Sequence, residues 1–101
     1  MAFAYIWEYR VKMEHIESFR LTYHDNGEWV RFFRRDPAYI RTHLFSDLND
    51  RKRFITIDYR DTQQACYAFR KRFRAEFDAI DNRCVNYITE ERHLGDFDLP
   101  G

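Results

Sequence analysis

The sequence has few cysteines, no excess of charge of either sign and no long apolar run, and each absence excludes a class of protein. Two cysteines, Cys66 and Cys84, are too few for the disulfide framework of a small secreted domain. No apolar run reaches the roughly 18 residues typical of a membrane-spanning helix. The opening stretch MAFAYIWEYR lacks the charged start and the small-residue cleavage site of a signal peptide. We therefore expect a cytoplasmic protein without a membrane partner.

The charge balance and the histidine spacing exclude two further classes. Seventeen basic residues are matched by seventeen acidic ones, whereas a generic nucleic-acid-binding protein needs surplus Lys and Arg to neutralise phosphates. His15, His24 and His93 are not spaced from other ligand-type residues as in a zinc site. We predict no metal, no other cofactor and no nucleic-acid partner.

Aromatic residues are the abundant feature, with ten Phe, seven Tyr and two Trp in 101 residues. Such side chains bury a large area each and occur both in cores and in subunit interfaces. A domain of this size buries only part of its surface. We therefore expect a thin aromatic core and a second copy of the chain that covers one face.

Residues 53–80 predict a strand that leads directly into an amphipathic helix. The apolar period changes from two to nearly four after residue 60, and Asp61 with Gln64 has the spacing of a capping box, with Asp61 as the N-cap. Within the strand, alternation separates two faces. We expect one face to lie away from the helices, and it carries Phe54, Thr56, Asp58 and Arg60.

The remaining patterns predict strands at 3–12, 39–47 and 86–94 and a helix over 14–35 that is interrupted near residue 26. In the first strand, the charges of Glu8 and Arg10 favour the face away from the helices, because burial there would desolvate them. The order βαββαβ predicts an α+β, ferredoxin-like fold with an antiparallel sheet and both helices on one face. Residues 1–97 form the single domain, and residues 98–101 form a short C-terminal tail.

The sheet face without helices would still carry apolar groups, namely Phe54, Ile6 and either Ile40 or Phe45. An exposed apolar face of this kind is typical of an interaction site. We predict a symmetric homodimer whose two sheets curl toward each other around a cavity. RNA-recognition domains share the βαββαβ order, but the strand RFITIDY has no glycine and Asp58 would repel phosphate.

Several short motifs resemble the antibiotic biosynthesis monooxygenase-like family over residues 3–97. They are Trp7-Glu8-Tyr9, Gly27-Glu28-Trp29, Phe32-Phe33-Arg34, the strand 39–44, Phe54-Ile55-Thr56-Ile57-Asp58 and the close at 91–95. The resemblance implies a dimeric α/β barrel with a cavity over the sheet of each subunit. The family includes cofactor-free oxygenases that act on quinol-like or polyketide aromatics, and haem-degrading enzymes. Many members carry a tryptophan at the end of the third strand, where this chain has Arg60.

Two functions remain open on the sequence. One is a cofactor-independent monooxygenase acting on an aromatic or quinol-like molecule, with Asp58 or His43 as the base and Arg60 or Arg10 as the anion stabiliser. The other is a non-catalytic dimer that binds such a molecule, in which Asp58 and Arg60 belong to a structural ion-pair network. The expected substrate-binding residues are Glu8, Arg10, Thr56, Phe54 and Trp29.

Overall fold

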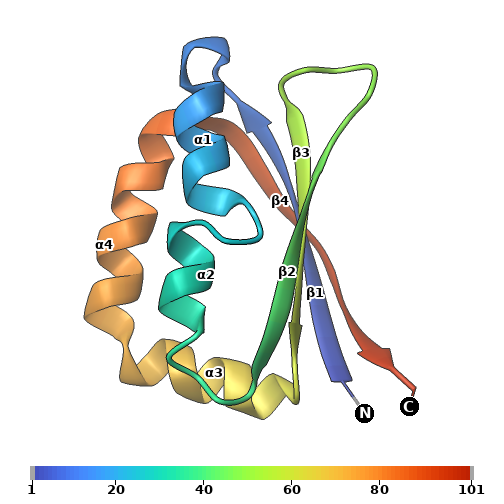
Figure 1. The fold of residues 1–101 in the computed structure, drawn as a ribbon, viewed down its shortest axis with the longest axis vertical. Coiled ribbons are helices and arrows are strands. Elements are labelled where there is room, and N and C mark those ends of the chain that lie inside the picture. The colour runs from blue at the N-terminus through green and yellow to red at the C-terminus, as the bar shows by residue number, and fades with distance from the viewer. Residues whose placement is uncertain (1, 101) are drawn as a thin grey trace.

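The computed structural model describes residues 2–100 and consists of one four-stranded antiparallel sheet with helices on one face (Figure 1). The elements in chain order are β1 Ala2–Val11, η1 Met13–His15, α1 Ile16–Tyr23, α2 Glu28–Phe33, β2 Tyr39–Ser46, β3 Arg53–Arg60, α3 Gln63–Arg72, α4 Arg74–Cys84, η2 Val85–Tyr87 and β4 Ile88–Leu99. The strand order is β2-β3-β1-β4. This confirms the α+β, ferredoxin-like class.

The break between α1 and α2 falls where the sequence predicts it. Gly27 precedes α2 with an ordinary negative φ of −83°, so its role is to leave space rather than to adopt a left-handed conformation. A Cβ atom there would lie 2.6 Å from the carbonyl oxygen of Thr22, well inside contact distance. Only glycine therefore lets the chain turn this closely after α1.

The helix that the sequence predicts after β3 differs from the prediction at its start and in its middle. Thr62, rather than Asp61, is the N-cap, because its hydroxyl accepts a hydrogen bond from the backbone N–H of Ala65 at 3.1 Å. The helix also breaks at Phe73, whose φ and ψ of −108° and 36° are not helical. Figure 1 shows the result: α3 crosses the end of the sheet, and α4 turns away from it to run beside α2 and α1.

The register between β1 and β3 fixes which side chains face the helices. Tyr9 lies opposite Phe54 and Tyr5 lies opposite Asp58, and directly opposed residues of an antiparallel pair share a face. Phe54 is fully buried, and its ring packs 4.9 Å from the ring of Phe19 in α1. The face that carries Phe54, Thr56, Asp58 and Arg60 therefore lies beneath the helices, and the prediction that it points away from them is wrong.

The prediction for β1 is confirmed, since its aromatic side chains pack under the helices and Glu8 and Arg10 point the other way. The open face carries Ile6, Ile55 and Ile57 at its centre, each partly buried, whereas Phe54 is absent from it. Phe45 and Phe97 are half exposed, at 50% and 49%.

Strand β4 continues beyond its predicted end at residue 94. Its pairing with β1 shifts by one residue between Ile6 and Trp7, and Gly95 lies at this bulge with a φ of +156°. A glycine inside a strand often marks a bulge rather than an end. Residues 95–99, which follow the predicted last strand, pair with the first half of β1. No helix among residues 2–100 is long and apolar enough to span a membrane.

Candidate active site

A cavity of about 360 Å³ lies between the sheet and the helices of the single chain. Its floor is formed by side chains of β1, β2 and β3, and its roof includes Trp29 and Phe33 of α2, Phe69 of α3 and Phe77 of α4. The lining residues that remain exposed to solvent come from α3 and β4, namely Tyr67, Arg70, Glu91, His93 and Asp96. The cavity therefore opens between the edge strand β4 and the helices. This cavity is therefore not the one that the sequence predicts, which would lie between the sheets of two subunits.

The structure brings four of the predicted site residues together at the cavity. Thr56, Asp58 and Arg60 lie in its floor, and Trp29 lies in its roof. Phe54 belongs to the same face but is packed into the core beside them. Three other predicted residues, Glu8, Arg10 and His43, lie on the opposite face of the sheet.

Asp58 is a buried carboxylate with a single hydrogen-bond donor among the described residues. It is 5% exposed, and the Thr42 hydroxyl donates to its Oδ1 atom. The only proton of the Thr42 hydroxyl is in this bond, so the Tyr39 hydroxyl, 2.7 Å from Thr42 Oγ1, is the donor in that contact. Burial raises the pKa of Asp58 to about 6, while the Thr42 hydrogen bond and the nearby Arg60 charge hold the pKa below what burial alone would give.

Arg60 is 1% exposed and its charge is compensated from several sides. Its guanidinium donates to Asp36 Oδ2 at 2.9 Å and to the Tyr5 hydroxyl at 3.2 Å. The guanidinium carbon lies 4.6 Å from the ring centroid of Phe33 and 5.1 Å from that of Phe69, within the range of a cation–π contact. Arg60 therefore provides a fixed positive charge at one end of the cavity.

The tyrosines of the floor keep their protons. Burial, followed by the Asp58 charge, raises the pKa of Tyr5 well above its ordinary value. Burial likewise raises the pKa of Tyr9. Both phenols are therefore neutral hydroxyl groups that can donate to or accept from a ligand.

Two residues at the mouth, His93 and Asp96, were not among the site residues that the sequence predicts. The His93 ring stacks on Trp7 at 5.1 Å between centroids, and its Nε2 atom lies 2.8 Å from Asp96 Oδ1. The sequence pattern placed His93 near the end of the last predicted strand and Asp96 beyond it. The bulge at Gly95 brings both onto the cavity side, and periodicity alone does not indicate such a bulge.

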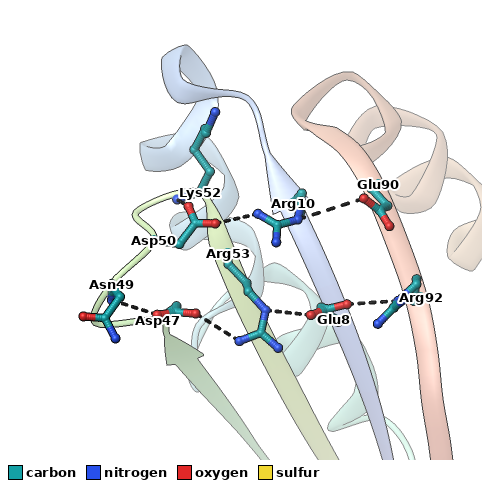
Figure 2. Close-up of polar contacts among 9 residues, drawn as sticks. All are labelled: Glu8, Arg10, Asp47, Asn49, Asp50, Lys52, Arg53, Glu90 and Arg92. Atoms are coloured by element: carbon teal, nitrogen blue, oxygen red, sulfur yellow. Dashed lines mark hydrogen bonds and ion pairs between the residues drawn. The ribbon is translucent and has the colours of Figure 1, made fainter.

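Glu8 and Arg10 are committed to ion pairs on the open face (Figure 2). Glu8 accepts from Arg53 at 2.6 Å and from Arg92 at 3.0 Å, and these bonds, Arg53 first, lower its pKa. Arg10 donates to Asp50 at 2.5 Å. The prediction that these two residues lie beside Asp58 is wrong, because the sheet separates them from it.

His43 lies on the open face opposite Ile57, with its ring 5.5 Å from the ring of Tyr59. It therefore does not reach the cavity. Burial raises the thiol pKa of Cys66 and of Cys84, which makes both poor nucleophiles. Within residues 2–100, no group of three or more His, Cys, Asp or Glu side chains is arranged to hold a metal ion.

No protein-family model and no curated protein matches this chain, but solved structures do. SnoaB from Streptomyces nogalater, described as a cofactor-independent oxygenase, is 17% identical, with 99% of this chain and 94% of that chain covered and a TM-score of 0.74. A Bordetella bronchiseptica protein named for antibiotic biosynthesis monooxygenases is 13% identical, with 98% and 97% covered and a TM-score of 0.79. One from Nitrosomonas europaea is 16% identical, with 95% and 88% covered and a TM-score of 0.72. The chain therefore has the antibiotic biosynthesis monooxygenase-like fold, as its motifs predict.

Proposed function

We propose that the protein is a cofactor-independent monooxygenase that oxidises an aromatic, quinol-like molecule in the cavity between sheet and helices, with Asp58 as the base. The observation that carries the proposal is a buried carboxylate with a pKa of about 6 in the floor of an aromatic-lined cavity. A base with a pKa near the working pH combines a large ionised fraction with a useful proton affinity. The fold is shared with a protein described as a cofactor-independent oxygenase.

The proposed reaction requires little from the protein besides this base. Asp58 takes the hydroxyl proton of the hydroquinone, and the resulting anion is electron-rich enough to give an electron to oxygen. A ring carbon then bonds to one oxygen atom, the O–O bond breaks, and the second oxygen atom leaves as water with two protons. The net reaction converts a hydroquinone and one O₂ into a hydroxyquinone and one water, so the substrate supplies all the electrons.

The surroundings of Asp58 support both parts of this step. The aromatic roof residues Trp29, Phe33 and Phe69 exclude water and present flat surfaces to a flat ligand. The fixed charge of Arg60 stabilises the substrate anion at the same end of the cavity. His43, the other base that the sequence suggested, is on the far side of the sheet and takes no part.

The same proposal includes a homodimer through the open face. Ile6, Ile55 and Ile57 form an apolar centre there, and Phe45 and Phe97 remain half exposed beside it. An apolar centre of this kind, flanked on the same face by the ion pairs of Glu8 and Arg10, is suited to a second copy of the same chain about a twofold axis. The helix-side cavity is lined by one chain, so dimerisation would support the sheet rather than build the site.

The test is oxygen uptake by metal-stripped protein with 1,4-naphthohydroquinone, corrected for autoxidation without protein. We expect protein-dependent uptake that falls at least about 100-fold in Asp58→Asn, in line with the loss of a general base. His43→Ala serves as the matched control and keeps its activity. Equal uptake by the wild type and Asp58→Asn would remove Asp58 from the role, and uptake no faster than the blank would reject the oxygenase.

A non-catalytic binding protein is the second candidate, and the Arg60 contacts favour it. The guanidinium is already paired with Asp36 and bonded to Tyr5, as in a structural network. Thermal stabilisation by a quinol, without oxygen uptake, would identify this function.

A further inference from the structure

Strand β4 places a histidine and an aspartate side by side at the mouth of the cavity. His93 and Asp96 both belong to the cavity lining. Residues three apart in a regular strand lie on opposite faces, so the two side chains meet only because the pairing of β4 with β1 shifts by one residue between them. Bulges of this kind often re-aim a side chain beside an active site.

The contact between the two side chains determines which nitrogen of His93 is free. Nε2 lies 2.8 Å from Asp96 Oδ1. An ionised carboxylate can only accept a hydrogen bond, so Nε2 carries the proton and Nδ1 of the neutral ring is an acceptor. The structure records no hydrogen bond to Nδ1 from any of residues 2–100. A histidine oriented by a carboxylate in this way has the arrangement of a general base.

The strand register sets the distance between His93 and the proposed base. Asp58 lies opposite Tyr5, and Tyr5 lies opposite Asp96, so these three residues form a row across β3, β1 and β4. His93 belongs to the next row, opposite Trp7. At about 4.8 Å between strands and about 6.6 Å between rows, the Cα atoms of Asp58 and His93 are about 12 Å apart.

A hydroquinone has the length to join these two side chains across the cavity. Its hydroxyl oxygens are about 5.5 Å apart, and a hydrogen bond of about 2.8 Å at each end extends the span to about 9–11 Å, depending on the bend at each oxygen. Asp58 and His93 line the same cavity, and the His93 ring stacks on Trp7 at 5.1 Å between centroids. One ring system can therefore have one hydroxyl at Asp58 and the other at His93.

We propose that His93 is a second acid–base residue of the site, which binds the second hydroxyl of the hydroquinone through Nδ1, with Asp96 as its positioning residue. This inference rests on the proposed function, because it concerns the molecule whose first hydroxyl lies at Asp58. Asp96 acts only through His93, since its carboxylate holds Nε2 and so keeps Nδ1 available for the ligand.

The reaction gives His93 a defined proton to move. Once the hydroquinone anion has given an electron to oxygen, the remaining hydroxyl of the radical is far more acidic than before, and Nδ1 takes its proton. A ring carbon bonds to one oxygen atom. As the O–O bond breaks, the hydrogen of that carbon and the proton held on Asp58 leave with the second oxygen atom as water. His93 then returns its proton to the ring oxygen from which it came, which is the hydroxyl of the hydroxyquinone.

The test compares two compounds that differ in one hydroxyl group. The compound 1,4-naphthohydroquinone carries both hydroxyls, and 1-naphthol has the same rings with only one. Dissociation constants are measured by calorimetry without oxygen, so the result does not depend on turnover. We expect the hydroquinone to bind the wild type about tenfold more tightly than the naphthol, as for one added hydrogen bond.

The variants show whether the histidine causes that preference. His93→Phe keeps a ring that can stack on Trp7 but removes both nitrogens, and should reduce the preference to about twofold or less. His15→Phe makes the same exchange in η1, outside the cavity lining, and should keep the preference at about tenfold.

Two changes at Asp96 test its positioning role. Asp96→Ala lets the imidazole turn and should reduce the preference to about threefold or less, whereas Asp96→Asn keeps an oxygen for the Nε2–H group and should retain at least about fivefold. A merely structural role of Asp96 would change the affinities of both compounds alike and leave their ratio at about tenfold. Circular dichroism checks folding, and if His93→Phe does not fold, the two Asp96 variants decide the matter.

The outcomes separate this inference from the proposed function. A tenfold preference that His93→Phe abolishes and His15→Phe keeps supports the inference, even if no oxygen is consumed. Equal affinities in the wild type, a preference that His93→Phe leaves unchanged, or no binding of either compound at millimolar concentration overturns it. Where the wild type consumes oxygen, His93→Phe should lower kcat at least about tenfold. Uptake that depends on Asp58 but not on His93 would uphold the oxygenase and reject the second acid–base residue alone.

Discussion

Replacing Asp58 by asparagine should stabilise the protein at neutral pH. The folded state raises the pKa of this carboxyl from 3.8 to about 6, so it disfavours the charged form. Below the unfolded value, near pH 4, the group is protonated in both states and has no effect. As the pH rises toward about 6, Asp58 loses its proton in the unfolded chain before it does so in the folded protein. The amount by which Asp58 destabilises the folded state therefore grows to about 3 kcal/mol and then stays constant.

The variant Asp58→Asn keeps an acceptor for Thr42 but carries no charge at any pH. Its free energy of unfolding, from urea titrations at a fixed protein concentration, should match the wild type near pH 3 and exceed it by about 3 kcal/mol above pH 7. Thr42→Val removes a hydrogen bond that lowers the Asp58 pKa, so the pH at which the cost levels off should move upward. A stability difference that is the same at every pH, or an asparagine variant that is weaker at neutral pH, would refute this account of Asp58.

Three further changes test the rest of the structure. Asp36→Asn leaves the buried guanidinium of Arg60 without its ionic partner, and should cost about 3 kcal/mol in a urea titration; a loss below about 1 kcal/mol would show that the charge is otherwise compensated. Gly27→Ala places a Cβ atom 2.6 Å from the Thr22 carbonyl oxygen and should lower the free energy of unfolding by about 1–3 kcal/mol, whereas an unchanged value would mean that the α1–α2 turn relaxes freely. Ile57→Lys puts a charge at the centre of the open face and should give a monomer in sedimentation where the wild type gives a dimer. The proposed interface would be contradicted if the wild type and the variant were both monomers or both dimers.

The sequence identified the elements and the fold class but placed one strand face incorrectly. In β1, the charges of Glu8 and Arg10 indicated the open face, since burial would have desolvated them. In β3, the apolar residues Ile55 and Ile57 resembled the core side. They lie instead on the face proposed for a second copy, while Asp58 and Arg60 are buried beneath the helices with their own polar partners.

The physical reason is that alternation separates two sets of residues but does not say which set meets the helices. The register of β3 against β1 decides it, and that pairing joins residues about 50 positions apart along the chain. The gathering of Trp29, Thr56 and Asp58 at one cavity depends on the same long-range pairing. The site therefore exists only where the paired strands bring these residues together, and no local pattern in the sequence contains it.

The central claim is that the ligand binds between the sheet and helices of one chain and contacts Asp58. The most direct measurement is a crystal structure of the protein with 1,4-naphthohydroquinone, grown without oxygen. The account predicts the compound inside the helix-side cavity, with one phenol oxygen within hydrogen-bond distance of the Asp58 carboxylate. A compound seated on the open face between two sheets, with this cavity filled by side chains or water alone, would contradict it.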